Sequence, residues 1–75
     1  MAATTQRKDI PDMVGKTFTP KNRGRTWSVH NEITVRYGER VQISEAWTTE
    51  SGNFCVFENK GVDRFALDDF EEVTA

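Results

Sequence analysis

The residues that could support covalent chemistry are few in this chain. Acyl or thiol chemistry needs a nucleophile, a base and an orienting group within hydrogen-bond reach. Cys55 is the only cysteine and His30 the only histidine. Cys55 lies in the apolar run Phe54-Cys55-Val56-Phe57, where a thiol behaves as a small hydrophobe. His30 lies among polar residues and is expected at the surface, so the two do not suggest a catalytic pair.

Carboxylates near the C-terminus are the other candidates for chemistry, namely Asp68, Asp69, Glu71 and Glu72. General acid–base catalysis requires one carboxyl group of a pair to be desolvated, so that its pKa rises. We expect acidic residues this closely spaced to be solvated, and a patch for a basic partner is the functional alternative. A structural zinc takes four nitrogen or sulfur ligands, which one cysteine and one histidine do not supply. The sequence therefore predicts no enzymatic activity, no metal and no cofactor.

A cluster of basic residues interleaved with aromatic rings is the most suggestive group for binding. Its basic members are Lys16, Lys21, Arg23 and Arg25, and the rings beside them are Phe18 and Trp27. Basic side chains can hold phosphates while a ring stacks on a base, so the segment 16–25 is a candidate nucleic-acid interface. The net charge of −2 opposes this interpretation, because nucleic-acid modules are generally basic. A protein-binding patch and an ordinary solvated loop are the alternatives.

Aromatic residues at the ends of predicted strands are candidates for protein recognition. Trp47 precedes a polar connection and Tyr37 precedes Gly38. A half-buried tryptophan with its indole N–H exposed suits recognition of a protein, and core packing is the alternative for Trp47. The protein-binding candidates are these two rings together with the acidic residues Asp68, Asp69, Glu71 and Glu72.

The charges are divided unevenly between the two halves of the chain. Residues 1–40 contain eight Lys/Arg and four Asp/Glu, and residues 41–75 contain two Lys/Arg and eight Asp/Glu. The halves therefore carry +4 and −6, which sum to −2. Such an asymmetry can create a dipolar surface that steers a partner, or it can be neutralised when the halves pack together.

Short strands must position these residues. Between positions 26 and 37 the apolar residues fall on odd numbers and the polar residues on even numbers, with Asn31 breaking the series. Side chains on a strand alternate faces, so this pattern predicts a half-buried antiparallel strand pair, bent near residues 30–32. The core is predicted to contain Trp27, Val29, Val41, Phe54, Val56 and Leu67.

The remaining segments are also short and β-prone, without a helix longer than one turn. Residues 10–15 are predicted to form either a single helical turn or an extended arm. Further elements are an edge strand at 16–19, strands at 41–47 and 54–57, a tight hairpin at Asn59-Lys60-Gly61, a returning strand at 62–67, a 3₁₀ turn at 68–70 and a last strand at 71–73. We predict a flexible N-terminal tail over residues 1–9 and a single small β-barrel domain over residues 10–75.

Three segments resemble the SH3-like small barrels, the architecture of SH3, Tudor, KOW and chromo-type domains. Gly38-Glu39-Arg40-Val41-Gln42-Ile43 resembles their strand opening, Asn59-Lys60-Gly61 their distal hairpin, and the segment 67–73 their 3₁₀ turn and closing strand. The resemblance implies an all-β fold, a single SH3-like barrel of five or six short antiparallel strands with a 3₁₀ turn before the last strand. An OB-like barrel is the nearest alternative, although it usually needs a longer chain and a helix.

Two functions remain open at this point. The first is a non-catalytic protein-binding module whose partner is a host or cognate protein with a basic surface. The chain is similar in size and style to accessory proteins of phages and mobile elements, many of which bind and modulate a host protein. The second is a nucleic-acid-binding small barrel that uses the segment 16–25. We expect a cytoplasmic monomer or small homo-oligomer, because one cysteine allows no internal disulfide and no apolar run is long enough to span a membrane.

Overall fold

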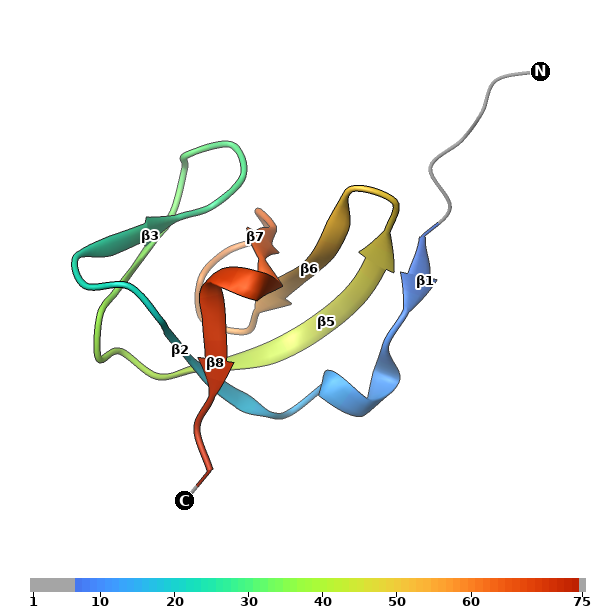
Figure 1. Ribbon diagram of the computed structural model, residues 1–75, viewed down its shortest axis with the longest axis horizontal. Coiled ribbons are helices and arrows are strands. Elements are labelled where there is room, and N and C mark those ends of the chain that lie inside the picture. Colours follow the sequence, from blue (N-terminus) through green and yellow to red (C-terminus); the bar gives the residue numbers. More distant parts are fainter. Residues whose placement is uncertain (1–6, 75) are drawn as a thin grey trace.

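The computed structural model describes residues 7–74 and contains antiparallel β-strands joined by turns (Figure 1). Its elements, in chain order, are β1 (Lys8–Asp9), η1 (Pro11–Met13), β2 (Thr17–Pro20), β3 (Arg25–Trp27), β4 (Thr34–Arg36), β5 (Val41–Thr49), β6 (Gly52–Phe57), β7 (Phe65–Ala66), η2 (Leu67–Asp69) and β8 (Phe70–Glu72). Both η elements are single 3₁₀ turns, and the described part of the chain has no α-helix. The prediction of an all-β antiparallel fold with a 3₁₀ turn before the last strand is confirmed.

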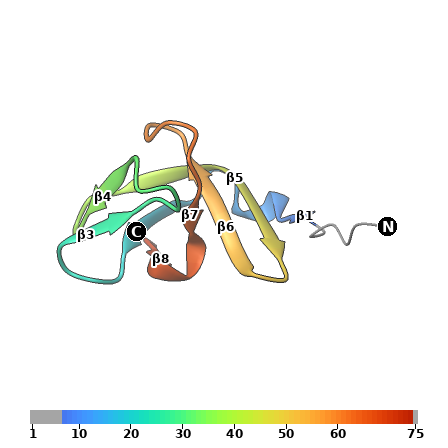
Figure 2. The ribbon, with the colours of Figure 1, turned by 90° about the horizontal axis from the view of Figure 1, so that it is seen from above.

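The long strand β5 organises the main sheet, whose order is β7-β6-β5-β2-β8. One edge of β5 pairs with β6, and its other edge pairs with β2 near Val41 and with β1 near Trp47. Strands β3 and β4 form a separate two-stranded ribbon. Figures 1 and 2 show this ribbon at one end of the molecule and the β5–β6 turn at the other. Within residues 7–74 the sheet does not close on itself, so the closed barrel is not confirmed, although the fold is consistent with an SH3-like domain.

The N-terminal part of the chain lies along β5. Residues 1–6 of the predicted tail lie outside the described residues, whereas Lys8 and Asp9 form β1 opposite Thr48 and Trp47. The segment 11–13 forms one 3₁₀ turn, so the interpretation as a single helical turn is the correct one of the two alternatives. No helix of the described chain is long and apolar enough to cross a membrane.

Three phenylalanine rings make up the centre of the core. Phe57 lies 5.2 Å from Phe65 and 4.9 Å from Phe70, measured between ring centroids, and Phe65 meets Phe70 edge-on at 5.7 Å. Aromatic pairs with these separations stabilise a fold beyond the area that they bury. The other buried members of the core cluster are Phe18, Val35, Val41, Ile43, Ala46, Cys55 and Leu67. The predictions of Val41 and Leu67 as core residues are confirmed.

The predicted inward face is wrong for β3. Thr26 is buried there, while Trp27 and Val29 are exposed. The reason is the register of the ribbon, in which Thr26 faces Val35. In each facing pair an even-numbered residue of one strand lies opposite an odd-numbered residue of the other. Facing side chains point to the same side of the ribbon, so the inward residues are even-numbered on β3 and odd-numbered on β4. The alternation therefore could not hold for both strands, and the inward position of β4 belongs to Val35.

The predicted inward face is also wrong for β6. Phe54 and Val56 are only partly buried, whereas Cys55 and Phe57 are in the core. An irregularity in β5 between Ile43 and Glu45 shifts its pairing with β6. Such a bulge inserts one extra residue, so the inward positions of β5 change from odd to even numbers beyond it. The β6 residues that pair with Ile43 and Ala46, namely Phe57 and Cys55, therefore point into the core.

The returning strand predicted at 62–67 is much shorter than expected, because β7 spans only Phe65–Ala66. The residues before it make other contacts. The carbonyl of Arg64 accepts a hydrogen bond from Val29 N at 2.8 Å, and the Asp63 carboxylate binds the backbone of His30. The segment after β6 is therefore a loop fastened to the β3–β4 turn, not a tight hairpin.

The buried thiol of Cys55 provides a test of this packing. Burial raises the pKa of Cys55 to about 12 from an ordinary value of 9.0. That difference corresponds to about 1,000-fold less thiolate at a given pH, and the thiolate is the reactive form. We expect the native protein to resist a disulfide reagent such as 5,5′-dithiobis(2-nitrobenzoate) at pH 8, and the denatured protein to release one equivalent of chromophore at once. Rapid stoichiometric labelling without denaturant would contradict the burial of Cys55.

Candidate nucleic-acid interface

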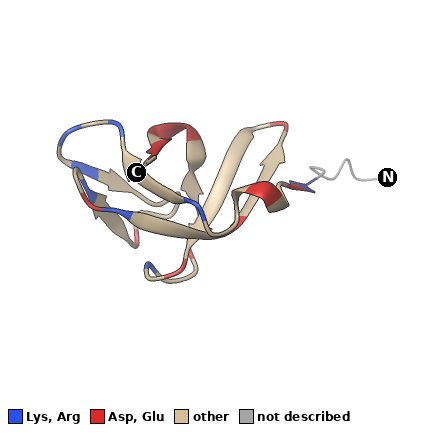
Figure 3. Cartoon of the chain, turned by 90° about the horizontal axis from the view of Figure 1, so that it is seen from below, with Lys and Arg blue, Asp and Glu red and all other residues tan. Residues whose placement is uncertain are grey.

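The outer face of the β3–β4 ribbon is strongly basic. Arg25 and Arg36 are direct cross-strand partners, and both side chains are exposed. Like charges placed opposite each other on an antiparallel pair destabilise it. Three further basic residues lie on the neighbouring segments, namely Lys21, Arg23 and Arg40. None of these five cations forms an ion pair with a residue in the range 7–74. Figure 3 shows Lys and Arg gathered at this end of the molecule.

Two exposed aromatic rings accompany these cations. Trp27 follows Arg25 by two residues on β3, so both side chains share the outer face. Trp27 and Tyr37 are each 51% exposed, which is high for large aromatic side chains. The guanidinium carbon of Arg23 lies 5.6 Å from the centroid of the Tyr37 ring, within the range of a cation–π contact. The ribbon therefore presents guanidinium groups and free ring surface together.

A buried carboxylate holds the ribbon in place. The side chain of Asp63 is only 3% exposed and accepts hydrogen bonds from His30 N at 3.0 Å and Arg64 N at 2.9 Å. The His30 ring contributes a further contact, with Nδ1 at 2.9 Å from Oδ1 of Asp63. The Ser28 hydroxyl hydrogen-bonds the same carboxylate and, with the other contacts, holds the pKa of Asp63 well below its usual range. The contacts from Ser28 and His30 fix the β3–β4 turn against the loop before β7, to which Asp63 and Arg64 belong.

A second link joins the ribbon to the loop after β6, at the end of the ribbon away from its turn. Lys60 Nζ forms an ion pair with Glu39 Oε2 at 2.6 Å, and Glu39 Oε1 accepts a hydrogen bond from Arg36 N. The hydrogen bond from Lys60 is the main reason that the pKa of Glu39 is lowered from its ordinary value. The ribbon is thus fastened at its turn and near its base, which limits the freedom that its arginines would lose on binding a ligand.

We expect the stability contributed by Asp63 to depend on pH. The pKa of Asp63 is lower in the folded chain than its ordinary value of 3.8, so the unfolded chain takes up the proton first as the pH falls. The contribution is therefore complete above about pH 4 and is lost as the pH falls further, towards the folded pKa. Asp63→Asn should lower the melting temperature by about 5 °C or more at pH 6, with a smaller difference from wild type at pH 2.5.

Thermal melts of both proteins across this pH range measure the effect. Asp69→Asn is the matched control, because it removes one exposed carboxylate and should follow the wild-type profile. A constant difference between wild type and Asp63→Asn at every pH would show that Asp63 acts only through packing.

The structure places the members of the predicted basic cluster in two different environments. Lys21 and Arg23 lie in the connection between β2 and β3, and Arg25 begins β3, with all three residues exposed. Lys16 instead lies 3.8 Å from Glu72 in an exposed ion pair, and the neighbouring ring of Phe18 is buried in the core. Sequence reasoning missed Arg36 and Arg40. The polar face of the alternating stretch contained Arg36, but only the ribbon register places it opposite Arg25.

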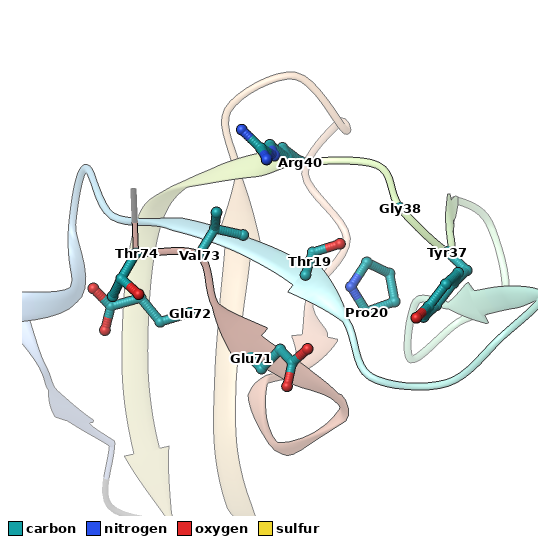
Figure 4. Close-up of a pocket in the computed structure, with 9 residues that line it drawn as sticks. All are labelled: Thr19, Pro20, Tyr37, Gly38, Arg40, Glu71, Glu72, Val73 and Thr74. Carbon is teal, nitrogen blue, oxygen red and sulfur yellow. The ribbon is translucent and has the colours of Figure 1, made fainter.

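The predicted protein-binding residues lie in separate places. Tyr37 lines a hollow of about 400 Å³ together with Pro20, Arg40, Glu71 and Glu72. In Figure 4 the rings of Tyr37 and Pro20 lie side by side, with the Glu71 carboxylate on the neighbouring strand β8. Asp68 and Asp69 are exposed on η2, outside this hollow, and the amide of Asn53 donates to Asp68 at 3.4 Å.

Trp47 lies on a different part of the surface and is only 8% exposed. The guanidinium of Arg7 covers its ring at 4.0 Å and forms ion pairs with Glu45 at 2.8 Å and with Asp9 at 3.1 Å. Phe54 packs against Trp47 at 6.3 Å between centroids. The structure therefore does not bring Trp47 to Tyr37, and the single docking rim expected from both rings is not formed.

Comparisons with protein-family models, with curated proteins and with solved structures found no match to this chain. Between residues 7 and 74 no three side chains of His, Cys, Asp or Glu are grouped as a metal site would require. The basic ribbon face and the hollow beside Tyr37 are therefore the surfaces from which a function can be inferred.

Proposed function

We propose that the protein is a non-catalytic nucleic-acid-binding module that uses the outer face of the β3–β4 ribbon. The observation that carries this proposal is the cross-strand pair of Arg25 and Arg36, which has no acidic partner in the described chain. Two like charges facing each other cost stability in the free protein. A polyanion would remove that cost, because its phosphates accept from both guanidinium groups.

The net negative charge does not oppose this function once the charges are placed in space. Figure 3 shows Lys and Arg concentrated at the ribbon end, whereas the acidic residues are spread over the molecule, including η1, η2 and β8. Electrostatic attraction at short range depends on local charge, because salt screens exposed charges beyond about 8–10 Å. Glu39 near the base of the ribbon is neutralised by Lys60 at 2.6 Å. Glu32 in the β3–β4 turn and Glu71 and Glu72 beside Arg40 form no ion pair with the five cations.

Binding of a labelled oligonucleotide at two salt concentrations tests the proposal. If about three phosphates are neutralised, the logarithmic salt slope for a single strand is about −2. The affinity should then fall roughly 15-fold between 50 and 200 mM salt. Fluorescence polarisation with 15-nucleotide DNA and RNA probes measures this change. The absence of binding at 50 mM salt with both probes would end the proposal.

A second candidate function is a protein-binding module that docks on a basic partner surface. The observation in its favour is the hollow that joins Tyr37 and Pro20 to Glu71 and Glu72. The rings of Tyr37 and Pro20 could contact the alkyl part of a Lys or Arg side chain, while the carboxylates bind its charged end. The partner would be a host or cognate protein, as expected for an accessory protein of a phage or mobile element. A lysine-rich peptide that binds wild type and loses affinity with Glu71→Lys would support this candidate, whereas equal binding by the variant would exclude the hollow.

Assignment to the SH3-like small barrels is a further part of the proposal. Its support is the antiparallel strand order β7-β6-β5-β2-β8 and the position of η2 directly before β8. A cytoplasmic location would place such a module beside its nucleic-acid or protein partner. An experimental structure of the chain in solution tests whether the sheet edges approach each other as in a closed barrel.

A further inference from the structure

We infer that Trp27 and Asn31 form a binding site for an unpaired nucleobase, so that the ribbon binds single strands in preference to duplexes. This inference rests on the proposed nucleic-acid function and names the form of nucleic acid that the same face would take. Its starting point is an open hollow of about 400 Å³ that Trp27 and Asn31 line together at the turn of the ribbon.

The indole of Trp27 is available for stacking. Its side chain leaves the core because Thr26 and Ser28 occupy the inward positions of this segment. The Trp27 cross-strand partner is Thr34, a small residue that does not cover a ring of this size. Stacking of a base on an exposed aromatic ring needs no particular base, because every base has a flat π face.

The amide of Asn31 is placed to meet the edge of a stacked base. Asn31 has a φ of 59°, a conformation that asparagine tolerates better than most residues, and its backbone N–H donates to Ser28 O at 2.9 Å. The Ser28 hydroxyl accepts from the N–H groups of Glu32 and Ile33, each at 3.1 Å. These bonds fix the turn while the Asn31 side chain has no hydrogen bond within residues 7–74, so both its donor and its acceptor are open to a base.

The arginines of the same face are placed to hold the backbone of that nucleotide. Arg25 and Trp27 are separated by two residues on one strand, which corresponds to about 6.6 Å. Arg36 lies directly across from Arg25. One nucleotide therefore has its base at Trp27 and its phosphate within reach of the arginine pair. In a duplex both faces of each base are covered by neighbouring base pairs, so Trp27 has nothing to stack on and only the phosphate contacts remain.

Affinities for a mixed-sequence 15-nucleotide DNA strand and for the same strand annealed to its complement test the inference. We expect wild type to bind the single strand about 10-fold more tightly than the duplex. Trp27→Leu should lower the affinity for the single strand about 10-fold and leave the duplex affinity unchanged. Trp27→Phe keeps an aromatic face and should retain most of the affinity. Asn31→Ala should weaken single-strand binding by about 3- to 10-fold.

Tryptophan emission gives an independent readout, because Trp27 is exposed and Trp47 is buried. Adding the single strand should quench the emission of wild type but not that of Trp27→Phe, in which only Trp47 emits. Equal binding of duplex and single strand, with no effect of Trp27→Leu, would overturn the inference while the proposed function stands. Failure of wild type to bind either form at 50 mM salt would overturn both.

Discussion

Phe57→Ala is expected to leave the chain largely unfolded at 37 °C, whereas Phe54→Ala should still melt cooperatively above that temperature. Truncating a fully buried phenylalanine costs about 3–5 kcal/mol. A domain of this size has a total stability of about 5 kcal/mol. Phe57 is 1% exposed and contacts both Phe65 and Phe70, so its loss leaves a cavity at the centre of the core.

Phe54 is the matched control, because it lies on the same strand and the substitution is the same. Its side chain is only partly buried and packs against Trp47 and Arg64 at the rim of the sheet. We expect its truncation to cost about 1–2 kcal/mol. Circular dichroism melts of the two variants measure the difference. Equal melting temperatures would mean that the two faces of β6 are buried alike, contrary to the arrangement described here.

The sequence indicated Phe54 instead of Phe57 as the core residue, and the reason for this error is structural. The run 54–57 is apolar at every position, so its alternation carries no information about which face lies inward. The bulge near Ser44 decides the face, because it changes the phase of β5 and hence of the residues paired with it. A bulge depends on pairing between strands, which a local sequence pattern does not reveal.

Local signals predicted the fold more successfully than the face of each strand. The bend near residues 30–32 was predicted from the lapse in the apolar series, and Asn31 has the positive φ of a tight turn there. The 3₁₀ turn before the last strand was predicted as well. In contrast, the sequence indicated an inward Trp27, because it could not supply the register that places Thr26 opposite Val35.

The candidate site was predictable in the same limited sense. Lys21, Arg23 and Arg25 are close in the sequence, so their cluster could be recognised, whereas Arg36 joins them only through the ribbon register. The Asp63 carboxylate that fixes the turn is 33 residues from His30, and no local pattern connects the two. Contacts that depend on strand pairing or on buried polar groups therefore required the structure.

The two functional candidates make opposite predictions for Arg25. We expect Arg25→Glu to weaken binding of an oligonucleotide about 10-fold or more, and to reduce the salt slope by about 1, because one phosphate contact is lost and a repulsive charge is added. The same substitution should stabilise the folded chain by up to about 1 kcal/mol, because the introduced carboxylate would face the guanidinium of Arg36 across the ribbon. If the hollow at Tyr37 is the functional surface instead, binding of a lysine-rich peptide should not weaken.

Lys8→Glu is the control for net charge, because it also changes the total from −2 to −4 but acts on β1, at the far end of the molecule. Polarisation titrations and thermal melts of both variants separate the local effect from the global one. A local basic face predicts that only Arg25→Glu loses affinity, and that it does so while its melting temperature rises. If Lys8→Glu lowered the affinity for the oligonucleotide equally, binding would depend on net charge alone. The ribbon would then not be the interface. A fall in both affinity and melting temperature for Arg25→Glu would instead show that Arg25 stabilises the fold. In that case repulsion between Arg25 and Arg36 would not destabilise the free protein.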